Sequence, residues 1–499
     1  PPPPPPFSLP RPPPRSPRHG VRRQRQLCIR DRVFAYLDEV CLAGGHRQVA
    51  AALARLVAAA RQVSLQLNPD KCELVACAGR DHAVDARLFP EGFKLNRSGG
   101  MSLLGAPIGP IEFCENFTSA ERVEKVKPLL HALAELDDPQ TGLLLLRECA
   151  AFCKVVDAMR VTAPDSHASA LSAFDAEVRA CLETLCTGPL TAEAWQQASL
   201  TTSAGGLGLR HAVRHSPAAF AASLSATGPL CQDLDASYSL AWPANNAAVE
   251  AFNAAVLPAD QVTVPAPSPS RQQSLSNALD RALLAQLQAP APGRESFRAH
   301  LQLLQQPGPG AGAWLHAPPS EPLGLHVAGP LFRLMVKLRL RLPVLESDSH
   351  CPLCDGLVDR FGDHARSCPC GGDRTKRHHR LRSVLAARAQ AAGLSPEVEK
   401  VNLLPPRLEH GGAAEDGVRA GNGRRPADVW VGSWGLHGPA AFDLAVTSGM
   451  RAGQLAAVAA DGGRPAVDYE ARKRSHLQTE AQCAAEGLQF VPLVAEACS

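Results

Sequence analysis

The segment CPLCDGLVDRFGDHARSC, residues 351–368, contains four side chains of the types that bind zinc in proteins. Two residues separate Cys351 from Cys354, nine more precede His364, and three more precede Cys368. Three thiolates and one imidazole at this spacing can form a tetrahedral zinc site. Because four protein ligands leave no position open for water, we expect a structural ion.

Two neighbouring residues leave the ligand set open. Cys370 can replace Cys368 as the fourth ligand, and His350 can compete for a position. The alternative interpretation is that free cysteines and a histidine merely cluster in a loop. A close cysteine pair beside a histidine and a cysteine at finger-like spacing favours zinc.

A second pattern follows about sixty residues downstream, in RPAD (425–428) and AFD (441–443). Each Asp belongs to a short run with strand-like alternation, and a Gly-rich turn lies between the runs. The fifteen residues from Asp428 to Asp443 are enough for a hairpin that brings both carboxylates together. An Asp within an apolar strand is costly to bury unpaired, which favours a metal site over two solvated strand edges.

A basic cluster lies directly after the predicted zinc ligands. Its members, Lys376, Arg377, Arg380 and Arg382, predict contacts with the phosphates of DNA. The whole chain has a formal net charge of only +3, so charge over its full length indicates no partner. The sixteen Cys are scattered and no apolar run of about 18 residues occurs, so we expect a reducing compartment and no membrane span.

The N-terminal part has its own landmarks. Residues 33–42 predict two short strands around a turn at Asp38 and Glu39, and 46–62 predict an amphipathic helix. Residues 101–108 predict another strand. Thr118 with Glu121 is typical of a capping box at the start of a helix. Farther along, Gly205-Gly-Leu-Gly208 lacks the spacing of a phosphate loop and predicts a plain turn.

One further helix is expected at 331–342, where Arg333, Lys337 and Arg341 recur every four residues and predict one basic face.

In order, these landmarks resemble the non-LTR (LINE-type) retrotransposon polyprotein. Phe34–Gly45, with Tyr36-Leu-Asp-Glu39, resembles motif C of reverse transcriptases. Leu67–Lys71 resembles motif D, and Leu103–Gly109 resembles the primer-grip motif E. The helices after Thr118 then correspond to a thumb. The resemblance implies that Asp38 and Glu39 belong to a polymerase site.

That polymerase half is expected to be inactive. Such enzymes hold two metal ions with an Asp from motif A and the acidic pair of motif C. Nothing before Asp38 resembles motif A, motif B or the fingers, and Glu39 replaces the second Asp. The chain begins at Pro1 and runs through Pro/Arg-rich sequence into motif C, so we expect a fragment or a mispredicted 5′ end.

For the C-terminal part, the resemblance implies a zinc knuckle followed by a restriction-like endonuclease of the PD-(D/E)xK type. Asp428 and Asp443 would hold a catalytic Mg²⁺, and a Lys would orient the attacking water. The usual Lys position, two residues after the second acid, is Ala445. These elements carry a Lys on a following helix, and Lys473 is the candidate, on one predicted helical face with Tyr469 and His476.

The expected fold class is therefore α+β and multidomain: a partial reverse-transcriptase palm, a helical thumb, a zinc knuckle and a small α/β restriction-endonuclease-like domain. The expected boundaries are a disordered Pro/Arg-rich segment at 1–30, the palm at 31–115, the thumb-like domain at 116–250, a linker with a helical piece at 251–330, a basic helix and zinc knuckle at 331–385, and the endonuclease at 386–499.

The expected function is Mg²⁺-dependent nicking of target DNA for target-primed reverse transcription. The expected partners are DNA and the element's RNA, and the expected location is the nucleus; the sequence does not indicate an oligomeric state. One alternative is a non-catalytic, zinc-dependent nucleic-acid-binding remnant of a retroelement. The other is a helical scaffold with chance motifs, which must explain five landmarks in one order.

Overall fold

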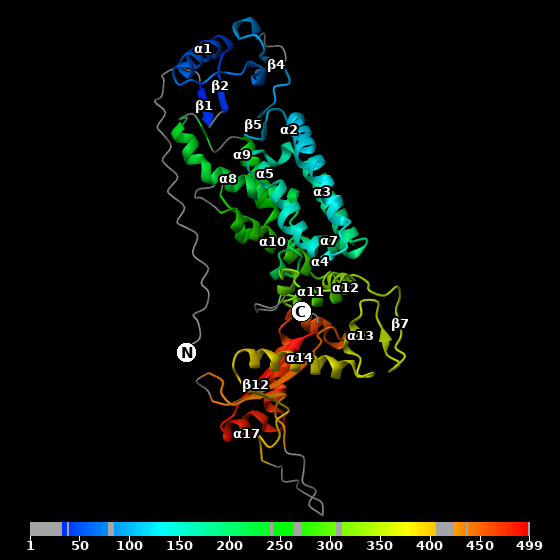
Figure 1. Cartoon of the computed structure of the whole chain (residues 1–499). Coiled ribbons are helices and arrows are strands. Elements are labelled where there is room, and N and C mark those ends of the chain that lie inside the picture. Colours follow the sequence, from blue (N-terminus) through cyan, green and yellow to red (C-terminus); the bar gives the residue numbers. More distant parts are fainter. Residues whose placement is uncertain are drawn as a thin grey trace, which may run out of the picture. The chain divides into compact units, whose positions relative to one another are not determined.

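The computed structural model describes residues 32–36, 39–77, 84–234, 236, 238–239, 243–263, 271–305, 312–405, 424–435 and 438–497. The fold is α+β, as predicted, with many helices and small sheets (Figure 1). The chain divides into two compact units, Pro1–Leu104 and Gly105–Ser499. The segment 1–30 and Asp38 lie outside the described residues, as does the side chain of Glu39.

In the first unit, β1 (Arg32–Tyr36) and β2 (Glu39–Ala43) pair antiparallel, and Tyr36 lies opposite Glu39. The predicted pair of strands is thereby confirmed, but Glu39, which was expected in the turn with Asp38, is the first residue of β2. The helix predicted over 46–62 is also present, as α1 (His46–Gln62), and Leu53 is its buried residue. The parallel pair β3 (Glu73–Val75) and β4 (Lys94–Asn96) follows.

The single strand predicted over residues 101–108 was wrong. The structure has β5 (Met101–Leu103) and β6 (Ala106–Ile108), and Leu104 and Gly105 between them adopt φ values of 52° and 76°. Two successive left-handed residues reverse the chain, so one continuous strand cannot form.

The second unit begins with helices. They are α2 (Ile111–Thr118), α3 (Lys125–Ala134), α4 (Pro139–Leu145), α5 (Val156–Val161), α6 (Ala168–Leu182), α7 (Ala192–Ser199), α8 (Ala212–Leu234), α9 (Pro243–Ala255), α10 (Gln272–Gln288), α11 (Glu295–Leu303) and α12 (Gly329–Arg339). Their largest core includes Leu130, Leu171, Phe174 and Phe332, each at most 2% exposed. The segment 251–330 contains both α10 and α11, not one helical piece.

The predicted capping box at Thr118 was wrong. The helix begins at Ile111, after Pro110, and continues through a π-helical stretch, Ser119–Glu124, into α3. Thr118 is a fully buried residue with helical dihedral angles, so its side chain does not cap a helix start. Glu121 pairs instead with Lys125, one turn along the same helix.

The predicted basic face over 331–342 was also wrong. Helix α12 ends at Arg339, and Arg341 has a φ of 54°, which takes it off the helix. Arg333 points inward, where its Nε donates to the carbonyl of Leu185 at 3.1 Å. The turn at Gly205–Gly208 is confirmed: Gly205 and Gly208 adopt φ values of 90° and 80°.

A small α/β region completes the second unit. It begins with the short pair β7 (Ser349–His350) and β8 (Leu357–Val358) and the short helix α13 (Asp363–Ser367). A four-stranded sheet follows in the order β12-β11-β10-β9. Its strands are β9 (Pro396–Val398), β10 (Val429–Val431), β11 (Ala440–Thr447) and β12 (Gln489–Glu496). The strands β9, β10 and β11 are antiparallel neighbours, and β12 is parallel to β11.

Helices cover both faces of this sheet. On one face lies α14 (Asp373–Ala391) (Figure 1). Its residues Leu385, Ala386 and Ala389 share a core with Val429 and Val431. The other helices are α15 (Leu455–Ala460), α16 (Arg464–Ser475) and α17 (Thr479–Ala485). On the opposite face, Cys483 of α17 packs with Ala441 and Phe490. This alternation of side chains along the strands is the pattern expected for a sheet buried on both faces.

None of the helices in the described part of the chain has the length and hydropathy needed to cross a membrane.

Candidate metal centre and carboxylate–lysine site

The cysteine and histidine side chains predicted as zinc ligands converge. One possible ligand atom each of Cys351, Cys354, His364 and Cys368 lies within 4.8 Å of the other three. The Sγ of Cys368 is 3.9 Å from that of Cys351 and 3.7 Å from that of Cys354, and His364 Nε2 is 3.3 Å from Cys354 Sγ. The cluster contains Cys368, whereas Cys370 and His350 are not members of it.

These spacings fit one tetrahedral ion. With metal–sulfur bonds of about 2.3 Å, tetrahedral angles place two thiolate sulfurs about 3.8 Å apart. Metal binding also requires deprotonated thiols. The backbone N–H of Leu353 donates to Cys351 Sγ at 3.4 Å and, together with His364 and Cys354, lowers the pKa of the Cys351 thiol to about 6. The pKa of the Cys354 thiol is raised instead, because desolvation and the neighbouring thiols of Cys368 and Cys351 disfavour its charged form. The cluster can therefore hold a metal ion.

Local backbone features bring the ligands together. Gly356 has no room for a side chain, because a Cβ there would lie 2.8 Å from His364 Cε1. The carboxylate of Asp359 accepts the N–H groups of Phe361, Asp363 and His364 at 3.0, 3.1 and 2.8 Å. These bonds satisfy the first turn of α13, the helix that carries His364.

The cluster is also anchored to the preceding helices. Arg341 makes a bidentate ion pair with Asp363, with distances of 2.8 and 2.6 Å, and its guanidinium lies over the ring of Phe361. Both side chains are mostly buried, at 6% and 13% exposed. The predicted DNA contact Arg377 binds the carbonyl of Arg366 at 2.9 Å, so α14 is joined to the same structure.

Asp428 and Asp443 lie on neighbouring strands of the sheet. Val429 is paired with Phe442, and the N–H of Asp428 donates to the carbonyl of Phe442 at 2.9 Å. Asp428 therefore stands next to Asp443 at the point where β10 begins. The predicted hairpin, with both Asp residues at the same level of the sheet, is confirmed.

Lys473 reaches Asp443 from α16. Its Nζ is 2.6 Å from Asp443 Oδ2 and donates to the carbonyl of Leu444 at 2.9 Å. Ala445, at the usual Lys position, is buried and contributes no charge. The ammonium therefore comes from a helix thirty residues downstream in the sequence, as predicted.

The Asp443 carboxyl group is influenced by its burial, by Asp428 and by Lys473. Burial raises the pKa of Asp443 above its usual range, and the nearby Asp428 carboxylate adds to the increase. Lys473 opposes both effects by favouring the charged carboxylate. Two anions and one cation therefore share a partly buried space, in which a second cation would lower the repulsion between the carboxylates.

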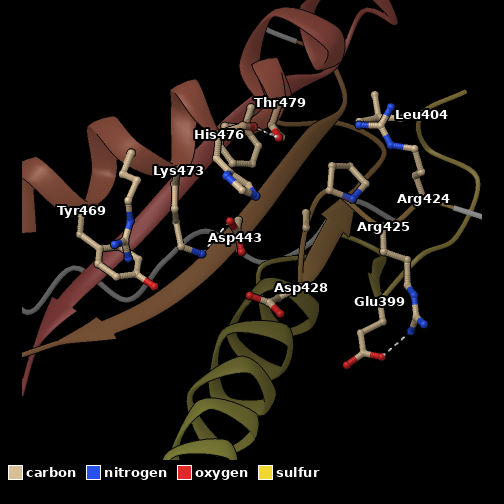
Figure 2. Close-up of a pocket in the computed structure, with 14 residues that line it drawn as sticks. Glu399, Leu404, Arg424, Arg425, Asp428, Asp443, Tyr469, Lys473, His476 and Thr479 are labelled. Carbon is tan, nitrogen blue, oxygen red and sulfur yellow. Dashed lines mark hydrogen bonds and ion pairs between the residues drawn. The ribbon is translucent and has the colours of Figure 1, made fainter. Parts of the chain in front are cut away.

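These three residues face a cavity of about 900 Å³ (Figure 2). Figure 2 shows Asp428 and Asp443 close to one another, with His476 above Asp443 and Lys473 reaching Asp443 from the side, between Asp443 and Tyr469. Helix α16 ends at Ser475, so His476 begins the next turn, but it lines the same cavity. Other charged side chains that line the cavity are Glu399, Arg424, Arg425 and Arg472.

The predicted DNA-binding residues of α14 have different surroundings. Lys376 and Arg380 are exposed, and Lys376 lies 3.2 Å from Asp373. Arg377 is bound to Arg366 as described, and Arg382 pairs with Glu399. Arg425 pairs with the other oxygen of Glu399 at 2.9 Å, a contact drawn in Figure 2. Of the predicted polymerase residues, Asp38 lies outside the described residues, and Glu39 is described only by its backbone in β2.

Sequence analysis missed two residues that contact Asp428. His378, on α14, places its Nε2 2.9 Å from Asp428 Oδ1. The N–H of Glu399, which has a φ of 50°, donates to the carbonyl of Asp428 at 2.9 Å. The only sequence signal for His378 was its position between Arg377 and Arg380 of the basic cluster, and no role was predicted for it.

No protein-family model matches this sequence, and a search of curated proteins finds no match to it.

Proposed function

We propose that the chain is part of a retroelement reverse transcriptase/endonuclease and that its C-terminal region nicks DNA with the help of Mg²⁺. The observation that carries the proposal is the meeting of Lys473 with Asp443 beside Asp428 in one cavity. Two carboxylates can hold a metal ion for phosphodiester hydrolysis, and an ammonium beside them can offset negative charge on the phosphate. The resemblance of the sequence to non-LTR retrotransposon polyproteins supports the same assignment.

In this proposal each residue has a separate task. Asp428 and Asp443 offer the oxygen ligands that Mg²⁺ prefers. When bound, Mg²⁺ supplies charge stabilisation for the scissile phosphate and lowers the pKa of a water molecule. Lys473 lies close enough to Asp443 to orient a water molecule beside that carboxylate for attack. Its positive charge would also offset negative charge on the phosphate.

The cysteine–histidine cluster is proposed to hold a structural Zn²⁺. Its donor types and sulfur spacings support zinc over Mg²⁺, which prefers oxygen ligands. Bound zinc would hold α13 and the start of α14, and the basic residues of α14 would then be presented to DNA. Action on chromosomal DNA, with the element's RNA as second partner, would place the protein in the nucleus.

The second candidate function is DNA binding without cutting. The contact that favours it is the same Lys473–Asp443 ion pair, because a carboxylate already paired with an ammonium is satisfied without a metal ion. This candidate shares the zinc site and the basic helix with the first. The two functions differ only in whether DNA is cut.

The test is a nicking assay with the full chain on supercoiled DNA. The protein should nick with Mg²⁺ and stop when EDTA is added. Asp443→Ala should lower the rate at least about 100-fold, and Lys473→Ala about 100-fold, because each removes a group that acts on the reacting phosphate. Both variants should bind DNA as tightly as the parent.

The matched controls are Asp461, which follows α15, and Arg464, which lies on α16 with Lys473. Asp461→Ala removes an exposed carboxylate, and Arg464→Ala removes an exposed cation at the start of α16. Both should nick at the parent rate. If Asp443→Ala nicks as fast as its parent, the nuclease assignment is wrong. If the parent binds DNA and does not nick it, the binding function replaces it.

A further inference from the structure

We propose that His378 is a positioning residue that fixes the orientation of the Asp428 carboxylate, so that helix α14 prepares the site for its cation. This inference rests on the proposed nuclease function and deepens it. It assigns a role to a side chain that was not among the predicted site residues.

Both oxygens of Asp428 have a donor. His378 Nε2 lies 2.9 Å from Oδ1, and the N–H of Leu444 donates to Oδ2 at 2.7 Å. One donor on each oxygen fixes rotation about the last side-chain bond, so the plane of the carboxylate is set. An ionised carboxylate only accepts, so this bond requires the histidine tautomer that has its proton on Nε2. Each oxygen keeps a second lone pair with which to bind a cation.

The neighbouring carboxylate is held from a different helix. Lys473 of α16 contacts Asp443, whereas His378 of α14 contacts Asp428. The side chains Leu385 and Ala389 of α14 pack on the sheet face formed by Val429 and Val431. The distance between the two carboxylates therefore depends on how both helices are seated on the sheet.

A second connection joins α14 to Asp428. Arg382, one turn along α14 from His378, pairs with Glu399, and the N–H of Glu399 donates to the carbonyl of Asp428. Asp428 is thus linked to the same helix through its side chain and, by way of Glu399, through its backbone. Two links to one helix are what a positioning role requires, because a single hydrogen bond leaves the residue free to turn.

The adjacent histidine supplies a contrast. His379 is exposed, while the His378 side chain is only 30% exposed and its partner Asp428 only 15%. A histidine that served DNA phosphates would keep its donor toward solvent, as His379 can. His378 instead directs its Nε2 to a carboxylate.

The experiment compares His378→Ala, His378→Gln and the matched control His379→Ala in the full chain. The Gln side-chain amide can donate from a position close to that of Nε2, so it should retain the bond to Asp428. Rates are measured with Mg²⁺ over a range of DNA concentrations. Calcium binding without DNA is measured by calorimetry, which gives a readout that does not depend on cutting.

Loss of an outer partner of a metal ligand lowers affinity or activity by about 10–100-fold. We expect His378→Ala to lower kcat by that factor and calcium affinity about tenfold, with the KM for DNA unchanged. His378→Gln should recover most of both losses. His379→Ala should match the parent in all three quantities.

Several outcomes overturn the inference. The inference is wrong if the parent nicks DNA and the His378→Ala variant has the same kcat and the same calcium affinity. It is also wrong if His378→Gln does not restore kcat and calcium affinity, because the histidine would then have a packing role. A change in the KM for DNA alone would show that His378 is a DNA contact. A parent that neither nicks nor binds calcium overturns the proposed function itself, and this inference with it.

Discussion

At the scale of single residues, Cys368 and Cys370 are two positions apart and have different surroundings. Cys368 Sγ lies 3.7 and 3.9 Å from two other cysteine sulfurs, while half-buried Cys370 is not part of the cluster. Cys368→Ser should therefore lower zinc affinity by at least about tenfold, because a hydroxyl is a poor zinc ligand. Cys370→Ser should keep one zinc per chain after dialysis, as measured by atomic emission. The reverse pattern would show that the fourth ligand is Cys370.

The residues that could be predicted at this scale each had a local signal. Asp428 and Asp443 interrupt apolar strands, and Lys473 occupied a helix position that the family resemblance indicated. His378 could not be predicted in the same way. Its partner lies fifty residues away in the sequence, and a histidine among arginines on a polar helix indicates only an exposed basic surface.

At the scale of elements, Asp175 of α6 caps a different helix. Its carboxylate accepts the N–H groups of Ala212 and Val213, in the first turn of α8, at 2.7 and 3.2 Å. Burial nevertheless raises the pKa of Asp175 to about 7, because the loss of hydration outweighs the two backbone hydrogen bonds. In an unfolded chain the pKa of an Asp is about 3.9.

This raised pKa predicts a pH dependence of stability. The folded state binds the proton more tightly than the unfolded state, so the contribution is complete below about pH 4 and is lost as the pH rises through about 7. The free energy of unfolding of the parent, relative to Asp175→Asn, should fall on the order of 2–4 kcal/mol between pH 4 and pH 8. Urea unfolding of both proteins across this range measures it. A constant difference would mean that Asp175 titrates normally.

Elements with strong periodicity were predicted correctly, α1 with both its ends, whereas the bounds of the helices around Thr118 and Arg341 were not. Helix α1 follows from apolar residues that recur at helical spacing, and the pair β10–β11 follows from alternation of apolar residues along each strand. The start of α2 and the end of α12 depend on tertiary contacts instead. Thr118 is buried by packing, and Arg341 leaves the helix to meet Asp363, a residue beyond the reach of helical periodicity.

At the scale of the whole second unit, the helices and the small α/β region share a core. Ala299 and Leu303 of α11 pack with Met450 and with Val458 of α15. Leu303→Ala should cost about 2–4 kcal/mol of unfolding free energy, because it opens a cavity in this shared core. Hydrogen exchange should then become faster in α15 as well as in α11, and should be unchanged in α3.

The control for that change is Leu257→Ala, at a position that is 38% exposed. It should leave both the stability and the exchange of α15 as in the parent. If Leu303→Ala speeds exchange in α11 alone, the two regions are energetically independent. The sequence predicted separate domains and gave no sign of this core, since its members lie about 150 residues apart and none belongs to a motif.

The position of β12 has a consequence for biosynthesis. This strand lies beside β11, which carries Asp443, but it leaves the ribosome only after α15, α16 and α17. Until it arrives, a nascent chain presents an unpaired edge of β11, and α16 lacks the strand on which it packs. Such an edge is a template for aggregation and a natural substrate for chaperones. The contact between Lys473 and Asp443 is therefore expected to form only after β12 has emerged, and a nascent chain that still lacks this strand holds no assembled site.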